Sequence, residues 1–208
     1  MTVAQKKALE NLWPIYGLGP EEPFQPEIIF GRKAPLIVEI GFGDGGNLAA
    51  AAQKNPQNNY LGIEVHEPGI GHLMNVLAKR EIRNVRIVQG DAIEILRDRI
   101  DEGSIERINL FFPDPWPKKR HHKRRLVSPA FADLISRTLK SGGCFHTATD
   151  WEDYALHITE TMKACDRLRN VADGRPSLEL TAERFTTRFE QRGIALGHKV
   201  RDLVFLKN

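Results

Sequence analysis

The chain has 208 residues, of which 41% are apolar and 27% charged, and its formal net charge is +3. This composition excludes collagen-like, coiled-coil and wholly disordered chains, and the length predicts a single domain with one substantial core. The apolar runs are far shorter than the roughly 20 residues of a membrane span, and no apolar leader segment opens the chain. We therefore expect a soluble cytoplasmic protein without a membrane partner. Cys144 and Cys165 are expected to be free core thiols.

Strands and helices are predicted to alternate from residue 36 onward, after a polar N-terminal arm at residues 1–34 that includes a Pro- and Gly-rich stretch. Short β-branched runs predict strands at Leu36–Ile40, Tyr60–Val65, Val85–Gln89, Arg107–Phe112 and Cys144–Thr149. Helix-forming composition and spacing predict helices at Asn47–Lys54, Pro68–Arg80, Ala92–Arg99, Ser128–Leu139 and Trp151–Leu168, the last with Asp150 as its cap. Residues 178–205 are expected to form two final strands around a loop. The alternation over residues 35–208 predicts an α/β core with a doubly wound parallel sheet.

The first predicted strand runs into the glycine-rich segment GFGDGG. Its Gly41, Gly43 and Gly46 satisfy the G-x-G-x-x-G pattern of dinucleotide-binding sites, so an NAD(P)-dependent oxidoreductase is one alternative. Glu39 and Asp44 argue against it, because they place carboxylates beside the loop that would receive the pyrophosphate. S-adenosylmethionine would bring a sulfonium and an ammonium group to this loop instead.

Acidic residues stand at the ends of four predicted strands: Glu39, Glu64, Asp91 and Asp114. In a parallel sheet these ends share one edge, beyond which ligands bind. The carboxylate of Glu64 offers acceptors for both ribose hydroxyls, and Asp91 offers an acceptor for the adenine amino group. Each acid has the alternative role of a helix cap. Together they indicate a ligand that carries positive charge.

The basic segment, residues 118–125, reads KKRHHKRR and contains six Lys or Arg and no acid. The rest of the chain has 24 Lys and Arg against 27 Asp and Glu, so the positive charge is concentrated here. Such a segment is typical of a polyanion-binding loop, with a solvated turn as the alternative. It follows FPDPWP, whose three prolines restrict the backbone around Asp114. The sequence therefore places a candidate cofactor edge beside a phosphate-binding surface.

Motifs spread in order over almost the whole chain resemble the bacterial tRNA (guanine-N7)-methyltransferases. They are LWPIYGL (12–18), VEIGFGDG (38–45), GIEVHEPG (62–69), GDA (90–92), FPDPWPKKRHHKRRL (112–126), TD (149–150) and TRFEQRG (187–193). The resemblance implies a Rossmann-like methyltransferase fold, with a mostly parallel sheet and a C-terminal antiparallel strand. It also implies S-adenosylmethionine as cofactor and methylation of guanine N7 in tRNA, at position 46 of the variable loop. No metal ion and no obligatory protein partner are expected.

The resemblance further implies roles for individual residues. The cofactor would be bound by Glu39, Gly41, Gly43, Glu64, Asp91 and Asp114, and Asp114 would also be the catalytic acid. The substrate would be contacted by Lys118, Asp150, Thr187, Arg188, Phe189 and Glu190. The RNA would be contacted by Arg120, His121, His122, Lys123, Arg124 and Arg125.

The chemistry of guanine N7 suits this set of residues. Its in-plane lone pair is unprotonated at neutral pH, so the enzyme must mainly hold N7 in line with the methyl–sulfur bond, and such positioning supplies about 7–11 kcal/mol. The far edge of guanine has two adjacent donors, for which Asp150 and Glu190 are candidate acceptors, and Phe189 is a candidate stacking residue. A non-catalytic RNA-binding protein would leave the strand-end acids unexplained, and a methyltransferase for proteins or small molecules would leave the basic segment without a use.

Overall fold

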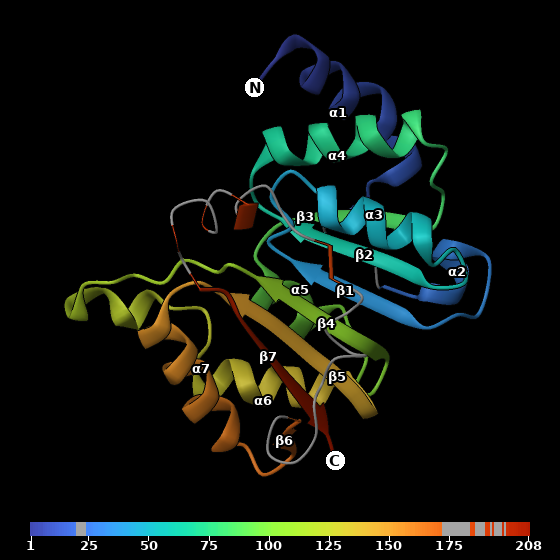
Figure 1. Cartoon of the computed structure of the whole chain (residues 1–208). Coiled ribbons are helices and arrows are strands. Elements are labelled where there is room, and N and C mark those ends of the chain that lie inside the picture. Colours follow the sequence, from blue (N-terminus) through green and yellow to red (C-terminus); the bar gives the residue numbers. More distant parts are fainter. Residues whose placement is uncertain (20–23, 172–183, 186–189, 192, 194–196, 198) are drawn as a thin grey trace.

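The computed structural model describes residues 1–19, 24–171, 184–185, 190–191, 193, 197 and 199–208. Within them seven strands form one sheet in the order β3-β2-β1-β4-β5-β7-β6 (Figure 1). The strands are β1 (Leu36–Ile40), β2 (Asn59–Glu64), β3 (Val85–Gln89), β4 (Ile105–Phe111), β5 (Leu139–Thr149), β6 (Leu168–Asn170) and β7 (Arg201–Lys207). Strands β1–β5 run parallel, whereas β7 is antiparallel to both β5 and β6. The mostly parallel sheet with an antiparallel C-terminal strand is confirmed.

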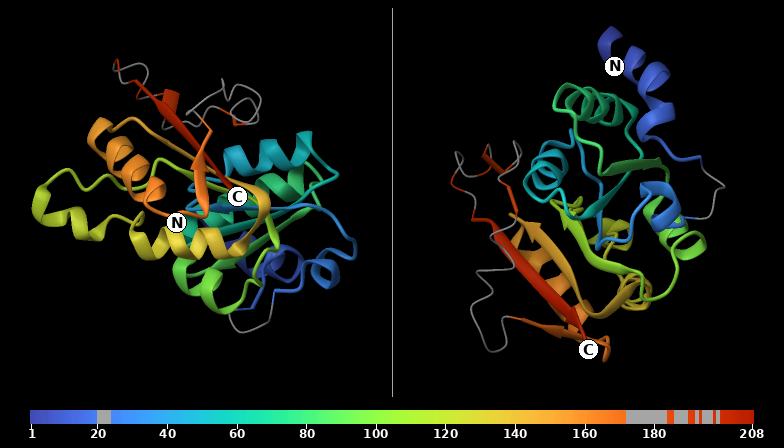
Figure 2. Two further views of the ribbon diagram at one scale, coloured as in Figure 1. Left: turned by 90° about the horizontal axis from the view of Figure 1, so that it is seen from below. Right: turned by 90° about the vertical axis from the view of Figure 1, so that its right-hand side faces the viewer.

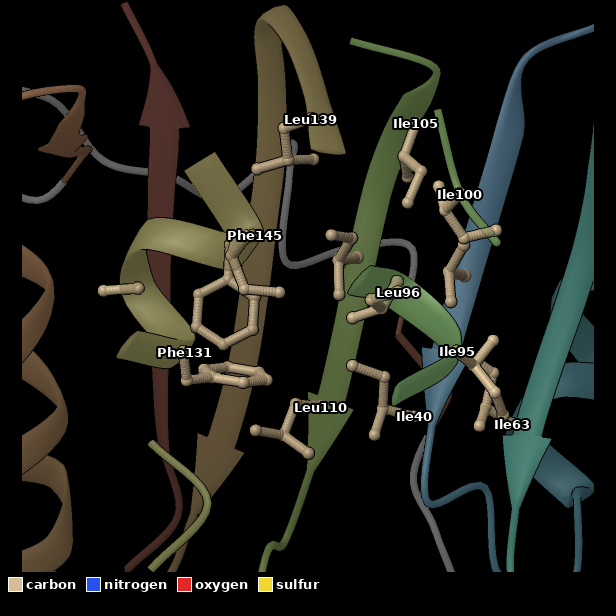
Figure 3. Packing of buried hydrophobic residues seen from close by; sticks show 14 of the residues in the cluster. Ile40, Ile63, Ile95, Leu96, Ile100, Ile105, Leu110, Phe131, Leu139 and Phe145 are labelled. Atoms are coloured by element: carbon tan, nitrogen blue, oxygen red, sulfur yellow. The ribbon is translucent and has the colours of Figure 1, made fainter. Parts of the chain in front are cut away.

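Helices cover both faces of this sheet (Figures 1 and 2). They are α1 (Val3–Tyr16), α2 (Pro26–Phe30), α3 (Gly46–Lys54), α4 (Glu67–Lys79), α5 (Ala92–Asp98), α6 (Pro129–Thr138) and α7 (Glu152–Lys163), and η1 (Lys119–Arg124) is a 3₁₀ helix. On one face, Leu96 of α5 and Phe131 of α6 join the cluster around Phe145 of β5 (Figure 3). On the other, Leu48 of α3 and Leu73 of α4 pack with residues of α1. The sheet is therefore doubly wound, as predicted.

Successive strands are added on opposite sides of β1, so the order of strands in the sheet switches between β1 and β4. From β1 the chain continues to β2 and β3 on one side, and β4 then returns to the other side of β1. Ligands of open α/β sheets bind at this switch point, beyond the carboxyl ends of the strands. Gly41 directly follows β1, and Asp114 lies three residues after the end of β4. The fold thus brings two predicted site residues to the expected crevice.

Two predictions near the C-terminus were wrong. Helix α7 ends at Lys163, and Leu168 belongs to β6, because Leu168–Asn170 pairs with β7 at the sheet edge. Asp150 does not cap α7: the N-cap residue is Trp151, whose own N–H donates to Thr149 Oγ1 at 3.2 Å. Strand β7 matches the second of the two expected final strands, and much of the stretch expected to hold the first lies outside the described residues.

The N-terminal arm contains a helix that the sequence analysis did not anticipate. Helix α1 begins with a capping box, in which Gln5 N donates to Thr2 Oγ1 at 3.3 Å and Thr2 N donates to Gln5 Oε1 at 2.6 Å. It packs on α4, where a Cβ at Gly71 would lie 2.6 Å from the Gln5 carbonyl oxygen. The arm therefore adds a layer outside α4. None of the described helices has the length and apolarity to cross a bilayer.

Candidate active site

A cavity of about 360 Å³ lies at the carboxyl ends of β1–β4. Its polar lining includes Glu64, Asp91 and Asp114, and Gly41 also borders it. Its apolar lining includes Ile40, Ile63, Val65, Ala92 and Leu110. The volume falls within the range of small-molecule sites. Three of the four predicted strand-end acids therefore come together around one space.

Glu39, the fourth acid, lies outside this lining. Its side chain is only 3% exposed, and Asn47 Nδ2 donates to Glu39 Oε2 at 2.7 Å. Burial raises the pKa of Glu39 to about 8; the Asn47 hydrogen bond opposes this shift and the nearby Asp44 adds to it. Gly43 also lies outside the lining, on the loop above Glu39, with a left-handed φ of 58°. Glu39 and Gly43 therefore do not line the cavity, in contrast to Gly41, Glu64, Asp91 and Asp114.

Glu64 and Asp91 hold backbone groups as well as lining the cavity. The Glu64 carboxylate accepts from the N–H groups of Gly43 (2.8 Å), Val65 (2.8 Å) and His66 (3.1 Å). Three of its roughly four acceptor positions are therefore used, which leaves about one for a ligand. Asp91 caps α5 by accepting from Ile93 N at 2.7 Å and Glu94 N at 3.3 Å. The helix-cap interpretation is thus confirmed for Asp91, in addition to its place in the cavity.

The loop that carries Asp114 has an unusual backbone. Asp114 is exposed between two prolines, and Phe112 and Trp116, on either side of this segment, have φ values of 52° and 45°. Non-glycine residues in this conformation are strained by about 1–3 kcal/mol, and such strain concentrates at functional sites. Arg125 braces the loop, since its Nε donates to the Pro115 carbonyl oxygen at 2.9 Å.

Arg125 itself is an interior residue. Its side chain is 2% exposed, forms an ion pair with Asp153 of α7 and lies over the Tyr154 ring at 4.8 Å. It therefore ties the Asp114 loop to α7. Its guanidinium is not presented to RNA in this structure, in contrast to the expectation from the sequence.

The rest of the basic segment lies at the surface. Exposed side chains belong to Lys118, Lys119, Arg120, Lys123 and Arg124, whereas His121 and His122 are half-buried. Arg124 lies 4.9 Å from the centre of the Trp116 ring, and both residues line the cavity. The exposed cations therefore begin at the mouth of the cavity.

Two of the predicted substrate residues, Asp150 and Glu190, lie on the β4–β5–β7 side. Asp150 is half-buried after β5, and because Phe111 pairs with Ala148, Asp114 and Asp150 emerge from neighbouring strand ends. Glu190 is buried and accepts from Arg184 Nη1 at 2.5 Å and Nη2 at 2.7 Å. Thr187, Arg188 and Phe189 lie outside the described residues.

Arg184 is the centre of a network that the sequence analysis missed. Its side chain is 8% exposed and donates to both Asp202 carboxylate oxygens, at 2.8 and 3.0 Å. Burial alone would lower the pKa of Arg184, but Glu190 and Asp202 more than offset this and hold it above its usual value. Asp202 also lies 2.8 Å from His146 Nε2. No sequence spacing connects these residues: pairing of β5 with β7 brings His146 and Asp202 together, and Arg184 reaches Asp202 and Glu190 from outside the strands.

A larger cavity, of about 420 Å³, lies at the opposite edge of the sheet. Its lining includes Arg32, Arg80 and Arg83. Arg32 donates to Asn59 Oδ1 at 2.9 Å and to two backbone carbonyls at 2.7 Å, and Arg80 donates to Gln53 Oε1 at 3.3 Å. The Arg32 and Arg80 side chains therefore form hydrogen bonds within the protein itself. The chemistry of the lining, rather than its volume, therefore places the site at the carboxyl edge.

A metal centre has no candidate in the part of the chain that the structure describes. There, no group of three or more His, Cys, Asp or Glu residues is arranged so that it could hold a metal ion.

Solved structures of methyltransferases share this fold. A 30S ribosomal A1408 methyltransferase from an uncultured bacterium superimposes with a TM-score of 0.63 at 18% identity, covering 93% of this chain and 98% of that one. Geranyl diphosphate C-methyltransferase from Streptomyces coelicolor, solved with S-adenosyl-L-homocysteine, gives a TM-score of 0.54 at 17% identity, covering 86% and 72%. These likenesses confirm the Rossmann-like methyltransferase fold.

Sequence comparison identifies the family. Residues 33–203 match the family described as "Putative methyltransferase". The chain is 56% identical to a tRNA (guanine-N(7)-)-methyltransferase of Methylococcus capsulatus over 209 residues, which cover 100% of this chain and 90% of that protein. It is 45% identical to the enzyme of the same name from Klebsiella pneumoniae, over 99% of this chain and 86% of that protein. The chain therefore belongs to the tRNA (guanine-N7)-methyltransferase family.

Proposed function

We propose that this protein transfers a methyl group from S-adenosylmethionine to N7 of guanine in tRNA, at position 46 of the variable loop, in the cytoplasm. The observation that carries the proposal is the acid-lined cavity that opens beside the exposed basic segment. Carboxylates suit a ligand with sulfonium and ammonium groups, and exposed Lys and Arg suit a phosphate backbone. The 56% identity to a protein of that name supports both halves of the proposal.

The residues around the cavity fit S-adenosylmethionine. Glu64 and Asp91 supply acceptors for the ribose and the adenine amino group, and Ile63 and Val65 supply apolar surface for the ring. Gly41 leaves room for close approach, because a Cβ there would meet nothing within 4 Å. When bound, this cofactor supplies an electrophilic methyl group on sulfur.

The protein's part in the reaction is to position the base. Asp114 stands where cofactor and base meet and orients the base, since N7 needs no deprotonation. Asp150 or Glu190 accepts from the N1–H and exocyclic amine of guanine, and Lys118, Thr187, Arg188 and Phe189 complete the substrate contacts. The exposed cations Arg120, Lys123 and Arg124, with His121 and His122, hold the RNA.

Product analysis tests this proposal. The purified protein is incubated with labelled S-adenosylmethionine and an unmodified tRNA transcript, and the labelled nucleoside is identified after digestion. We expect 7-methylguanosine, and none with a transcript in which G46 is replaced by adenosine. Label in another nucleoside, or undiminished label in the substituted transcript, contradicts the corresponding part of the proposal. Thermal shifts with S-adenosylhomocysteine but not with NADH separate it from the oxidoreductase alternative.

A further inference from the structure

Asn47 connects two parts of the site that are 138 residues apart in the sequence. It is the second residue of α3 and is 7% exposed. Its Nδ2 donates to Glu39 Oε2 at 2.7 Å, beneath the glycine loop. Its Oδ1 accepts from Phe185 N at 2.9 Å. One buried side chain thus bridges the cofactor side and the C-terminal segment.

The polarity of the amide makes this bridge directional. An amide has a donor end and an acceptor end, so the Glu39 carboxylate fixes which way Asn47 points. A reversed amide would place an NH₂ group against the Phe185 N–H, which is repulsive, and Oδ1 against the Glu39 carboxyl group, which is repulsive when Glu39 is ionised. The hydrogen bond to Phe185 therefore depends on Glu39 holding the other end of Asn47.

The segment held by Asn47 reaches the substrate side. The Phe185 ring also contacts α3, with Lys54 Nζ 5.6 Å from the ring centre. The neighbouring Arg184 binds both carboxylate oxygens of Glu190. Its guanidinium also lies 5.7 Å from the ring centre of Phe112, at the base of the Asp114 loop. A shift at Phe185 would therefore be passed to Arg184 and its partners.

We propose that Asn47 is a positioning residue that couples occupancy of the cofactor cavity to the placement of Arg184, Phe185 and Glu190. The inference rests on the proposed function for the identity of the two ligands. Glu39 lies two residues before Gly41, which borders the cavity, so a cationic ligand there favours the ionised carboxylate of Glu39. Ionisation strengthens its hydrogen bond with Asn47, which holds Phe185 in place. By linkage, RNA binding that fixes the same segment strengthens cofactor binding by the same factor.

Hydrogen exchange tests the link without RNA. In the wild type, S-adenosylhomocysteine should slow exchange in the peptide that contains Arg184 and Phe185, and Asn47→Ala should abolish this slowing at saturating ligand. Asn75→Ala is the control, because Asn75 lies on α4 away from the site, where its Nδ2 donates to the carbonyl oxygens of Gly71 at 3.0 Å and of Ala4 in α1 at 3.3 Å. Slowing that persists in Asn47→Ala, or that is absent from the wild type, overturns the inference.

Binding measurements test the coupling itself. We expect saturating S-adenosylhomocysteine to tighten tRNA binding at least about fivefold in the wild type, the lower end of usual coupling. The expected factor is below about twofold in Asn47→Ala and in Asn47→Asp, which keeps the acceptor for Phe185 but removes the donor to Glu39. An unchanged factor in both variants overturns the coupling. A wild-type protein that binds the ligand but not tRNA refutes the proposed function instead, and the hydrogen-exchange result still decides the role of Asn47.

Discussion

The cofactor side and the substrate side of the sheet edge are held by different kinds of contact. On the cofactor side, Glu64 and Asp91 accept from backbone N–H groups, mostly one to three residues away. On the substrate side, Arg125 reaches Asp153, 28 residues on, and Arg184 reaches Asp202, 18 residues on. The cofactor side is therefore held mainly by hydrogen bonds to nearby backbone groups, and the substrate side by ion pairs of buried arginines.

This difference has an energetic consequence. A carboxylate that caps a helix remains near water, so its loss costs about 1 kcal/mol of stability. A buried ion pair that loses one partner leaves an unpaired charge in the interior, which costs about 3–5 kcal/mol. The substrate side is therefore expected to be the more sensitive of the two to substitution.

The largest effect is expected on the substrate side at Asp114. Asp114→Ala should reduce methyl transfer by at least about 100-fold, because misplacing reacting groups by about 1 Å is enough for such a loss. The measurement is turnover with tRNA, and an unchanged melting temperature shows that the protein is folded. Asp101→Ala, in an exposed distant loop, is the control. Near-normal turnover of Asp114→Ala would remove Asp114 from the active site.

The next effect concerns the stability of the substrate side. Arg184→Ala should lower the free energy of unfolding by about 3–5 kcal/mol, because it removes the ion pairs of this buried arginine with the buried Glu190 and the half-buried Asp202. Arg97→Ala, which removes an exposed ion pair with Asp98, should have a far smaller effect on this free energy, because solvent screens the pair. Urea denaturation measures both. Equal decreases in the free energy of unfolding for Arg184→Ala and Arg97→Ala would show that burial does not make the Arg184 ion pairs more important for stability.

On the cofactor side, Glu64→Ala should weaken ligand binding. Loss of a hydrogen bond to a charged group costs about 1.5–3 kcal/mol, which is roughly 10- to 150-fold in affinity. Calorimetry with S-adenosylhomocysteine measures the change, and tRNA affinity measured without ligand should vary far less. An unchanged dissociation constant for the ligand would contradict the ribose role of Glu64.

The basic segment should divide into exposed and buried members. Neutralising Arg120, Lys123 and Arg124 together should flatten the slope of log affinity for tRNA against log salt by about 2–3, because each phosphate contact contributes about 0.7–0.9. Arg125→Ala should leave that slope unchanged and lower the melting temperature, because Arg125 binds Pro115 and Asp153 inside the protein. A flattened slope in Arg125→Ala would show that this residue does contact RNA.

A pH dependence of stability is expected at Glu39. Because burial raises its pKa to about 8 in the folded state, Glu39 stabilises the protein fully below its unfolded pKa near 4.5 and progressively less as pH rises towards 8. Glu39→Gln lacks this titration. Its melting temperature relative to the wild type should therefore increase between pH 5 and pH 8. A constant difference over this range would mean that the Glu39 pKa is not raised.

The sequence by itself determined the parallel core and the acids at its edge. Strands β1 and β3 were predicted with their observed ends, because a short β-branched run bounded by polar or glycine residues is a local signal. Glu64, Asp91 and Asp114 were placed together because parallel strands end at a common edge, a rule that needs only the order of elements. The helix predicted to begin at Ser128 does begin there: Ser128 is the N-cap of α6, and its Oγ accepts from Phe131 N.

Tertiary structure alone decided which polar residues are buried and what they hold. KKRHHKRR has no feature that separates Arg125 from Arg124, yet one lies inside the protein and the other at the surface. Asn47 meets both Glu39 and Phe185, and Arg184 meets His146 through Asp202, only after segments distant in the sequence have packed together. Burial and ion pairing depend on all the segments packed around a side chain, whereas sequence patterns report only on neighbours along the chain.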